Sequence, residues 1–552
     1  MTQDPAPQGG WRLYSQRYLR EDLLAALVVS VLLIPQSIAY AMLAGLPPQV
    51  GLYASLLPLM AYAALGSSPH LGLGPVAVLA LMIAQTLAQA PPGVSPSEAA
   101  LVLAAEVGII LALAAALRLD ALAALLSVPV LHGFETGATL AIAASQLPVL
   151  LGSPAKGFEL PALLESAAAS GFAFQPLAAA YGLAALLLLV AARRWLRGMW
   201  ARLAPLAVLL GAMALAAASD ALSHGVPLVG TLPPLHLGLS LPRLDAQLWL
   251  AMLPGALLVA LVGYVSSLVV AESLGRRANV RIDARAELRG LAGANMAAAL
   301  SGGMPVAASF SRSVLMFDAG SRTRMTGVFI AFAMGGAMLA LAGPLALLPK
   351  AVLGATILVA VLSGLKLGPY RDAWRYARPE ALLMVAVSLM VLCWSVTAAL
   401  GLGVLGSIAL LLQRTARPHV ALLGRVPGTE HYRNIDRYEV ECLPGVLGLR
   451  IDESLLFTNA RSLTDVVDAY LAPRPETRRV VLQMTPVNAI DFSGLEALRE
   501  LHDTLARREI RLDLSEVKGP VLDRLRAGHW EHWFRGRLFL SHHQGMEDAA
   551  PR

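Results

Sequence analysis

Two apolar segments of this chain, residues 70–90 and 301–318, are each interrupted by glycine and proline. Residues 72–75 are Gly-Leu-Gly-Pro, and residues 301–305 are Ser-Gly-Gly-Met-Pro. Each pattern predicts a half-helix that begins inside a membrane, where its N-terminus can hold an anion. Two such interruptions at corresponding positions of two halves are typical of transporters whose substrate lies near the membrane midplane, between the breaks.

The composition places the chain among the polytopic membrane proteins. Of its 552 residues, 57% are hydrophobic and 14% are charged, and the mean hydropathy of +0.63 is too high for a single soluble core. The two cysteines, Cys393 and Cys442, argue against a disulfide framework. The first apolar run extends from Leu23 to Leu46, so we expect it to remain as a first span rather than to be cleaved as a signal peptide.

Apolar runs divide the chain up to residue 413 into about fourteen segments, several of them too short to span alone. The interrupted segments are the third member of two groups of about seven. An odd number of spans in each group inverts the second group relative to the first. We therefore expect a polytopic α-helical membrane protein with about 14 spans in a 7+7 inverted repeat, followed by a small cytoplasmic α/β domain.

Arginine and lysine cluster in the loops that follow even-numbered spans. Most of them lie in residues 193–202, 276–289, 322–324 and 366–378. The loops after odd-numbered spans carry Lys156, Arg243 and Lys350 alone. The positive-inside rule then predicts a multi-pass protein of the inner (plasma) membrane with both termini in the cytoplasm. Because this topology accounts for the formal net charge of +6, we expect no nucleic-acid partner.

The composition changes after Gln413, where charged residues become frequent and long apolar runs end. Alternating strand and helix patterns follow and predict an α/β domain with a largely parallel sheet. The predicted elements are, in order, strand 445–451, helix 459–471, strand 479–483, helix 493–508, strand 510–514 and helix 518–527.

The expected parts of the chain differ in composition. They are a cytoplasmic N-terminal segment (1–20), a transmembrane domain (21–415), a linker (416–435), the α/β domain (436–535) and a C-terminal tail (536–552). The tail contains the adjacent pair His542-His543, and adjacent side chains do not easily face one site. We therefore expect a solvated tail rather than a metal site.

Several stretches resemble a known family. Residues 35–53, which begin Pro-Gln-Ser-Ile-Ala-Tyr-Ala-Met, and residues 308–313, Ala-Ser-Phe-Ser-Arg-Ser, resemble span signatures of the SulP anion transporters. That family includes sulfate permeases, bicarbonate transporters and prestin. Residues 427–433 and 491–495 resemble the STAS domain that follows its membrane part. The resemblance covers nearly the whole chain and implies a core domain, a gate domain, a homodimer, and cytoplasmic partners that bind through STAS.

Arg312 lies in the second interrupted segment. A cation near the membrane centre costs about 3 kcal/mol on insertion scales, so a functional reason for it is expected. Each half-helix N-terminus adds roughly half a positive charge, and the neighbouring serines add hydroxyl donors. These groups together predict an anion site. The alternative is that Arg312 pairs with Glu135, Asp318 or backbone carbonyls.

The resemblance also implies which residues line the anion pocket. They are Gln36, Tyr40, Gly74, Val76, Ala77, Phe310, Ser311 and Arg312. An amide, a phenol, small apolar walls and a cation suit an anion. From residue type alone, Gln36 equally satisfies the backbone bend around Pro35, and a tyrosine such as Tyr40 is more often an ordinary packing residue.

Coupling to a cation is the point on which this chain departs from the family. Many members carry Glu or Asp near the middle of the eighth span, where this chain has Ser266. A serine cannot carry the negative charge that would bind Na⁺ or a proton. Glu272 lies roughly 9 Å further along the helix and is by default an interfacial residue beside Arg276. With Ser266 and Glu272 as the candidate coupling positions, we expect anion exchange or uncoupled flux.

The remaining motifs narrow the class of function. Ser493 matches a position that is phosphorylated in some stand-alone STAS proteins, but serine is common at helix N-termini, and we expect a helix cap with a role in partner docking instead. The sequence contains no Gly-Lys-Ser/Thr phosphate loop, catalytic triad or metal-ligand constellation. We therefore expect neither an ATP-driven pump nor an enzyme, with no metal and no cofactor.

The predicted function is secondary active or facilitative transport of a small anion, by elevator-type motion of core against gate. Bicarbonate, sulfate, chloride and dicarboxylates remain open as substrates. A nucleobase symporter would share the membrane architecture, but it would require acidic residues on the eighth and tenth spans. The alternative from another class is a sensor or scaffold that binds an anion without transporting it and signals through STAS.

Overall fold

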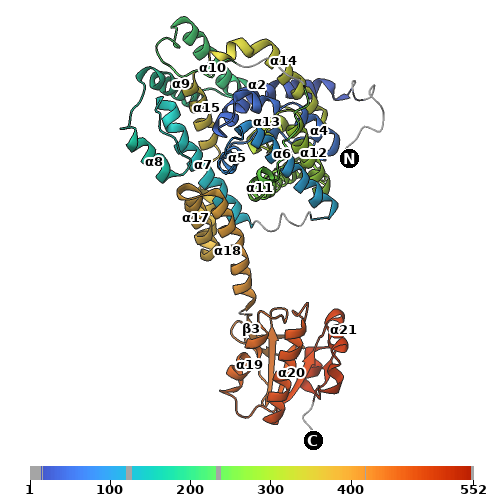
Figure 1. The fold of residues 1–552 in the computed structure, drawn as a ribbon. Helices are drawn as coiled ribbons and strands as arrows, with labels where there is room; N and C mark the ends of the chain where they lie inside the picture. The colour runs from blue at the N-terminus through green and yellow to red at the C-terminus, as the bar shows by residue number, and fades with distance from the viewer. Residues whose placement is uncertain (1–13, 15–16, 120–126, 232–237, 417, 549–552) are drawn as a thin grey trace. The chain divides into compact units, whose positions relative to one another are not determined.

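The computed structural model describes Tyr14 and residues 17–119, 127–231, 238–416 and 418–548. The chain forms two compact units, residues 1–407 and residues 408–552 (Figure 1). We call the first the membrane unit and the second the C-terminal unit. Each unit has an apolar core of its own.

The membrane unit is built from apolar helices. With the helix that leads out of it, they are α2 (Leu19–Leu43), α3 (Pro48–Tyr53), α4 (Leu57–Leu65), α5 (Ala77–Leu87), α6 (Pro96–Ala116), α7 (Val128–Leu151), α8 (Leu160–Ala169), α9 (Pro176–Trp195), α10 (Gly198–Ala218), α11 (Ala246–Ala278), α12 (Ala284–Leu300), α13 (Phe310–Asp318), α14 (Met325–Ala346), α15 (Lys350–Leu362), α16 (Gly368–Tyr376), α17 (Arg378–Cys393) and α18 (Val396–Ala416). Within the described ranges, seven stretches are long and apolar enough to cross a membrane. The polytopic helical class is confirmed, and the count of about 14 spans stays a prediction.

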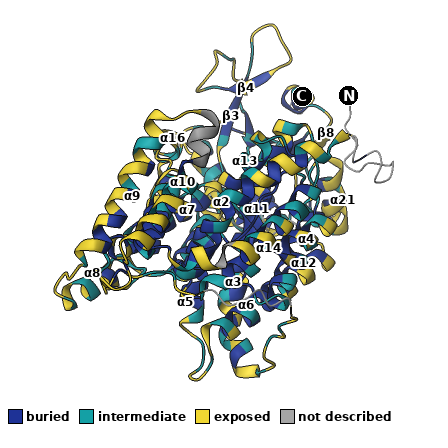
Figure 2. Ribbon diagram, turned by 90° about the horizontal axis from the view of Figure 1, so that it is seen from above, coloured by how far each residue is buried: buried dark blue, intermediate teal, exposed yellow. Residues whose placement is uncertain are grey.

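These helices pack in two groups. The core group consists of α2, α3, α4, α5, α6, α11, α12, α13 and α14, and the gate group consists of α7, α9, α10, α15, α16 and α17. The groups meet where α2 contacts α10 and α15, and where α5 contacts α7. Figure 2 shows buried residues along α2 and α11 and exposed residues along α8 and α9. The exposed leucines Leu187 and Leu188 of α9 suit a surface that faces lipid.

Two buried carboxylates hold one end of the core group together. Asp22, near the start of α2, accepts hydrogen bonds from the backbone N–H and the hydroxyl of Thr323, just before α14. Glu287, in the first turn of α12, accepts from the Tyr62 hydroxyl of α4 and from the N–H and hydroxyl of Ser67. The Arg324 guanidinium, next to Thr323, donates to the Gly66 carbonyl, next to Ser67, and so joins the two sets of contacts.

The C-terminal unit contains a six-stranded sheet in the order β4-β3-β5-β6-β7-β8. Its strands are β3 (Val420–Arg425), β4 (Tyr432–Asn434), β5 (Val446–Ile451), β6 (Arg479–Gln483), β7 (Arg511–Ser515) and β8 (Leu538–Phe539). Strands β5 to β8 run parallel, and β3 is antiparallel to β4 and β5. Its longer helices are α19 (Leu463–Leu471), α20 (Phe492–Arg507) and α21 (Gly519–Ala527), and a short helix, α22 (His542–Glu547), follows. The predicted α/β domain and its three strands are confirmed.

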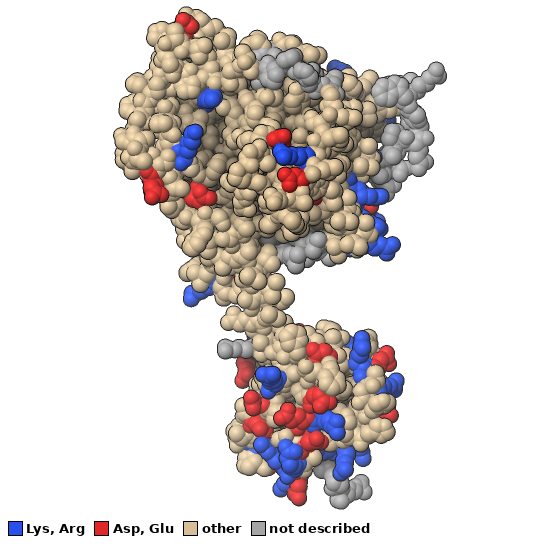
Figure 3. Space-filling model, in the orientation of Figure 1, with Lys and Arg blue, Asp and Glu red and all other residues tan. Residues whose placement is uncertain are grey.

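Surface charge separates the two units. In Figure 3 the visible face of the membrane unit carries few Lys, Arg, Asp or Glu side chains, whereas that of the C-terminal unit carries both signs interspersed. A surface of the first kind suits a bilayer, and a surface of the second kind suits water.

The structure corrects two parts of the predicted organisation. The expected linker, 416–435, contains β3 and β4, and the expected solvated tail, 536–552, contains β8 and α22. The strands β3 and β8 are short, and they are held in place by pairing with β5 and β7, which lie outside their local sequence. A local pattern of hydrophobic residues does not show such pairing.

His542 is buried on the sheet rather than solvated. Its Nδ1 lies 2.8 Å from the Ser515 hydroxyl of β7, and its ring meets the Tyr432 ring edge-on at 5.0 Å. Gly448 of β5 makes room for it, because a Cβ there would lie 3.1 Å from Nε2 of His542. α22 thus covers the face of the sheet opposite α19, α20 and α21.

Acid is expected to loosen α22 from the sheet. Burial lowers the pKa of His542 from 6.5 to about 4, so the ring is neutral in the folded unit. Because the folded pKa lies below the unfolded one, this contribution to stability is complete above pH 6.5. It is lost as the pH falls towards 4, by at most about 3 kcal/mol. In the full-length protein, hydrogen exchange of residues 542–547, corrected for intrinsic rates, should accelerate over this range. His542→Asn keeps an acceptor for Ser515 but does not titrate, so the same acceleration in that variant would refute the prediction.

Candidate anion-binding site

The two predicted breaks meet inside the membrane unit. β1 (Leu73–Gly74) precedes α5, β2 (Ala307–Ala308) precedes α13, and the two strands pair in antiparallel orientation. The Ser309 N–H extends this pairing by donating to the Gly72 carbonyl at 3.1 Å. α5 has 11 residues and α13 has 9, so neither crosses a membrane alone. The pairing brings the N-termini of two half-helices together, as the sequence predicts.

Neither half-helix has a side-chain cap at its N-terminus. The N-cap residues are Val76 for α5 and Ser309 for α13, and neither side chain accepts a hydrogen bond from the first turn. The N–H groups of both first turns therefore have no intrahelical acceptor, and the partial positive charge of each helix end is not offset by a cap. An anion fits such a pair of helix ends.

Arg312 of α13 links the two breaks. Its side chain is buried, with 4% of the residue exposed. Nε donates to the Gly72 carbonyl at 3.1 Å, and Nη2 donates to the Pro75 carbonyl at 3.0 Å. Nη1 is buried and has no hydrogen-bond partner among the described residues. The two N–H groups of Nη1 and the positive charge of the guanidinium are therefore available for a ligand.

The contacts of Arg312 confirm the alternative in which it bonds backbone carbonyls, while Nη1 stays without a partner among the described residues and the anion site stays a prediction. In the part of the chain that the structure describes, its hydrogen bonds go to backbone carbonyls rather than to Glu135 or Asp318. Both glycines of the first break give it space. A Cβ on Gly72 would lie 2.7 Å from Cγ of Arg312, and a Cβ on Gly74 would lie 3.1 Å from Nη1. The first break can approach the guanidinium only because these positions lack side chains.

Two buried polar residues hold the second break. Asn295 of α12 donates to the Val306 carbonyl at 3.1 Å and accepts from the Val306 N–H at 2.9 Å. The Ser267 hydroxyl of α11 accepts from the Ala308 N–H at 2.9 Å. Both side chains satisfy backbone groups that unwinding leaves without helical partners. Neither was predicted to contact the break, and no motif distinguishes them from other polar residues in apolar helices.

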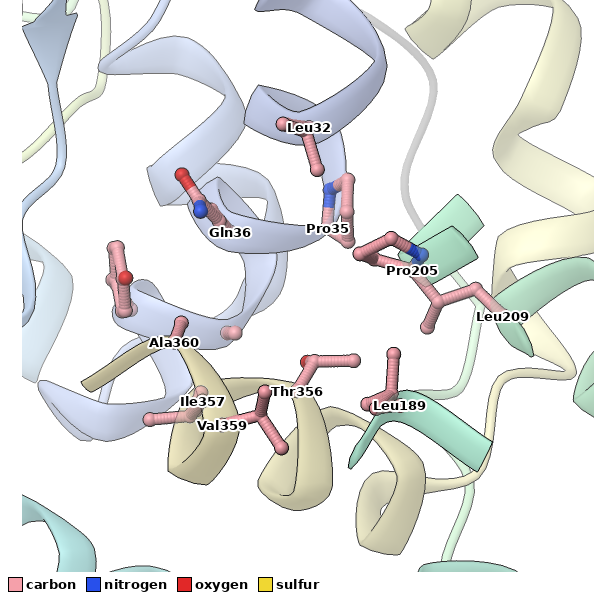
Figure 4. Close-up of a pocket in the computed structure, with 12 residues that line it drawn as sticks. Leu32, Pro35, Gln36, Leu189, Pro205, Leu209, Thr356, Ile357, Val359 and Ala360 are labelled. Atoms are coloured by element: carbon pink, nitrogen blue, oxygen red, sulfur yellow. The ribbon is translucent and has the colours of Figure 1, made fainter. Parts of the chain in front are cut away.

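Gln36 and Tyr40 line a cavity of about 100 Å³ between the core and gate groups (Figure 4). Both lie on α2, and Thr356 and Ala360 line the cavity from α15. Tyr40 is buried and close enough to Arg312 for an electrostatic interaction. The helix α2 also packs against α5 and α13, the half-helices that follow the two breaks.

The other predicted pocket residues lie at the breaks and do not line this cavity. Gly74 is buried in β1, Val76 is the half-buried N-cap of α5, and Ala77 is its buried first residue. Phe310 and Ser311 form the exposed first turn of α13, where the Ser311 hydroxyl lies 3.2 Å from that of Ser309. The structure therefore places some of the predicted pocket residues at the paired breaks and the others, Gln36 and Tyr40, at the boundary between the core and gate groups.

Lys366 is a cation that sequence reasoning treated only as a loop residue. It follows α15 in the gate group, and its Nζ lies 5.0 Å from the centroid of the Phe310 ring. This cation–π contact joins the gate group to the first turn of α13. Positive-inside counting groups Lys366 with the other basic loop residues, so no sequence signal marks its position.

The candidate coupling positions do not contact the breaks through the hydrogen bonds that the structure describes. The Ser266 hydroxyl donates to the Gly263 carbonyl of its own helix at 3.3 Å. Ser267, one residue further and about 100° around the helix, makes the contact with β2 instead. Glu272 is exposed on α11.

Ser493 is exposed in the first turn of α20 and is not its cap. The N-cap is Asp491, whose Oδ1 accepts from the Gly494 N–H at 2.8 Å. This corrects the prediction that Ser493 caps the helix, because an aspartate two residues earlier occupies that place. Over the described ranges, no group of His, Cys, Asp and Glu side chains is arranged to hold a metal ion.

Comparison with known proteins shows the family. The sequence profile of the sulfate permease family matches residues 19–387, and that of the STAS domain matches residues 437–545. A probable sulfate transporter of Mycobacterium tuberculosis is 35% identical over 531 residues, which cover 94% of this chain and 92% of that protein. The chloroplastic sulfate transporter 4.1 of Arabidopsis thaliana is 32% identical over 553 residues, which cover 94% of this chain and 79% of that protein.

Solved structures share the fold. The murine solute carrier 26 family member A9 anion transporter, in the inward-facing state, has a TM-score of 0.84 at 21% identity, over 96% of this chain and 92% of that chain. The transmembrane domain of the cyanobacterial bicarbonate transporter BicA has a TM-score of 0.60 at 18% identity, over 71% of this chain and 98% of that chain. The resemblance to SulP proteins is thus confirmed, and the chain belongs to the sulfate permease family as a multi-pass membrane protein with a C-terminal STAS domain.

Proposed function

We propose that the chain carries a small anion across the membrane, by secondary active or facilitative transport, and that the anion binds between the N-termini of α5 and α13. The proposal rests on Arg312, a buried cation whose Nη1 has no partner among the described residues. It lies where two uncapped half-helices meet. A bound anion would satisfy donors that cost free energy when they are buried without a partner.

Sulfate is the first substrate to test, because the mycobacterial and Arabidopsis relatives are sulfate transporters by name. Bicarbonate is the second, because the cyanobacterial protein is a bicarbonate transporter by name. Chloride and dicarboxylates complete the set. The guanidinium and two half-helix ends supply roughly two positive charges in all, which suits a divalent as well as a monovalent anion.

The motion that we propose is an elevator-type displacement of the core group against the gate group. Both breaks belong to the core group, so an anion held by Arg312 would move with it. The cavity beside Gln36 and Tyr40 and the contact between Lys366 and Phe310 lie on the boundary where the groups would slide. A contact of this kind is worth about 0.5–2 kcal/mol, which is weak enough to break in each cycle.

The proposed setting is the inner (plasma) membrane with both termini in the cytoplasm. The distribution of arginine supports this orientation. The contacts of Asp22 and Glu287 agree with it, because they join the start of α2 to the start of α14, and the end of α4 to the start of α12, as this topology requires. We further propose a homodimer, and cytoplasmic partners that bind through the STAS domain.

Transport is expected to be indifferent to Na⁺ and to a pH gradient. Ser266 carries no charge, and its hydroxyl bonds its own helix. Uptake of labelled sulfate into proteoliposomes, with a gradient of Na⁺ or of protons imposed separately, should therefore match uptake without a gradient. A several-fold stimulation by either gradient would show that a carboxylate elsewhere couples transport.

Counterflow uptake into proteoliposomes tests the proposal itself. Vesicles preloaded with unlabelled sulfate, bicarbonate, chloride or fumarate are given the labelled anion, and protein-free vesicles serve as the control. Saturable uptake of at least one anion is the expected result. Measurable binding of an anion without uptake of any would favour the sensor or scaffold that signals through STAS.

A further inference from the structure

A groove of about 580 Å³ lies on the core group, apart from the breaks. It runs along α12, between the end of α4 and the second half of α6, each of which packs against α12 (Figure 1). Its walls include Leu65, Gly108, Ala112, Ala116 and Gly293. Small side chains keep it open, and its volume is that of a ligand site rather than of a packing defect.

Two arginines line this groove, Arg285 and Arg289 of α12. They are four residues apart and so share one face of the helix. Nε of Arg285 donates to the Ala115 carbonyl at 3.0 Å, which fixes the guanidinium against the end of α6. Across the described ranges, Nη1 and Nη2 of Arg285 and the whole Arg289 guanidinium have no hydrogen bond or ion pair. The groove therefore combines an apolar wall with a pair of unneutralised cations.

The acidic residues nearest in sequence are engaged elsewhere. Glu287 is buried and accepts from Tyr62 and Ser67. Asp283 is the N-cap of α12, and its Oδ1 accepts from the N–H groups of Arg285 and Ala286. Neither carboxylate forms an ion pair with the two guanidinium groups in the part of the chain that the structure describes. The positive charge of the groove is therefore available to a ligand.

Local electrostatics of the helix do not favour these arginines. Arg285 lies in the first turn of α12 and Arg289 in the second, near the helix end that carries a partial positive charge. Cations are more stable at the opposite end of a helix. The positive-inside rule accounts for basic residues on this side of the membrane, but not for two that line one apolar groove.

We propose that this groove binds one anionic phospholipid. Its phosphate would lie on Arg285 and Arg289, and one acyl chain would follow the wall formed by Ala112 and Gly108. Charge complementarity selects an anionic headgroup, and an apolar wall next to it selects a molecule with a hydrocarbon chain. Basic pockets between transmembrane helices at the cytoplasmic surface bind anionic headgroups in the same way.

Native mass spectrometry of the full-length protein in detergent tests this inference. The probes are dioleoyl phosphatidylglycerol, dioleoyl phosphatidylcholine and inorganic phosphate. We expect one phosphatidylglycerol per chain to bind more tightly than phosphatidylcholine, and the double variant Arg285→Gln/Arg289→Gln to bind it roughly 30-fold more weakly. Arg276→Gln/Arg277→Gln removes two arginines from the end of α11, outside the groove, and should leave binding unchanged.

A variant that keeps Arg285 and Arg289 tests whether lipid binding needs the apolar groove as well as the positive charge. Ala112 is exposed on the groove wall, so Ala112→Phe fills the acyl path without disturbing buried packing. It should weaken phosphatidylglycerol binding severalfold, and it keeps the test decisive if the arginine variants do not fold. The proposal would be overturned if both lipids bound equally, or if Arg276→Gln/Arg277→Gln weakened phosphatidylglycerol binding as much as the groove variant does. It would also be overturned if Ala112→Phe bound phosphatidylglycerol as tightly as the wild type, or if millimolar phosphate displaced the lipid.

Discussion

Replacing Arg312 with glutamine is expected to abolish saturable anion uptake while the protein stays folded. The guanidinium bonds the carbonyls of Gly72 and Pro75 and keeps Nη1 without a protein partner among the described residues. A hydrogen bond to a charged group contributes about 1.5–3 kcal/mol, so its loss alone weakens anion binding about 10- to 150-fold. Glutamine also removes the charge. Its side chain is shorter and lacks the guanidinium fork, so it does not bond both carbonyls, and the pairing of β1 with β2 is expected to loosen.

The matched variant Arg312→Lys distinguishes the effect of the positive charge on uptake from that of the hydrogen-bond geometry of the guanidinium. Lysine keeps the positive charge, but its single nitrogen does not reproduce the fork that reaches two carbonyls and a ligand. Its uptake should lie between those of the wild type and of Arg312→Gln. Counterflow of labelled sulfate at equal reconstituted protein measures this, with the size-exclusion profile as the check on folding. Undiminished uptake by Arg312→Gln would show that the anion is held elsewhere.

Valine at Gly72 is expected to cause a comparable loss of uptake by separating the two breaks. A Cβ at this position would lie 2.7 Å from Cγ of Arg312 and 3.1 Å from its backbone carbonyl carbon. The backbone neighbour cannot move away as a flexible side chain can, so the first break must shift. That shift would lengthen the bonds from Arg312 Nε and from the Ser309 N–H, both of which end on the Gly72 carbonyl.

Gly336→Val is the control for this second prediction. Gly336 lies in α14, and nothing lies within 4 Å of a Cβ built on it. Its substitution tests the general cost of a β-branched residue in the membrane unit. Uptake by Gly336→Val should stay near that of the wild type, whereas uptake by Gly72→Val should fall more than tenfold. Equal activity of the two variants would mean that the close approach of the breaks is not needed for transport.

Local patterns in the sequence predict the class of the fold and the centre of the site. Apolar runs indicate membrane helices, and glycine and proline mark the breaks before α5 and α13. Arg312 stands out because a cation is rare and costly in such a segment. Strands β5, β6 and β7 follow from short β-branched and leucine-rich runs between helical patterns. Each of these signals lies within a few neighbouring residues.

The residues that sequence reasoning missed depend on contacts between distant segments. Ser267 rather than Ser266 reaches β2, because the rotation of α11 against its neighbours selects one of two adjacent serines. Lys366 contacts Phe310 only because the gate group packs beside α13. His542 is buried because α22 covers Gly448 and Ser515 of the sheet.

By itself, the sequence determined a polytopic membrane protein with two interrupted helices, a buried arginine and an α/β domain, because burial in lipid and breaks in helices are local properties. Only the tertiary structure decided which backbone carbonyls Arg312 bonds, which guanidinium nitrogen stays without a protein partner, and which short strands complete the sheet. Those outcomes depend on helix rotation and strand pairing across large sequence separations. The free energies that select them are therefore set by packing and not by any local pattern of residues.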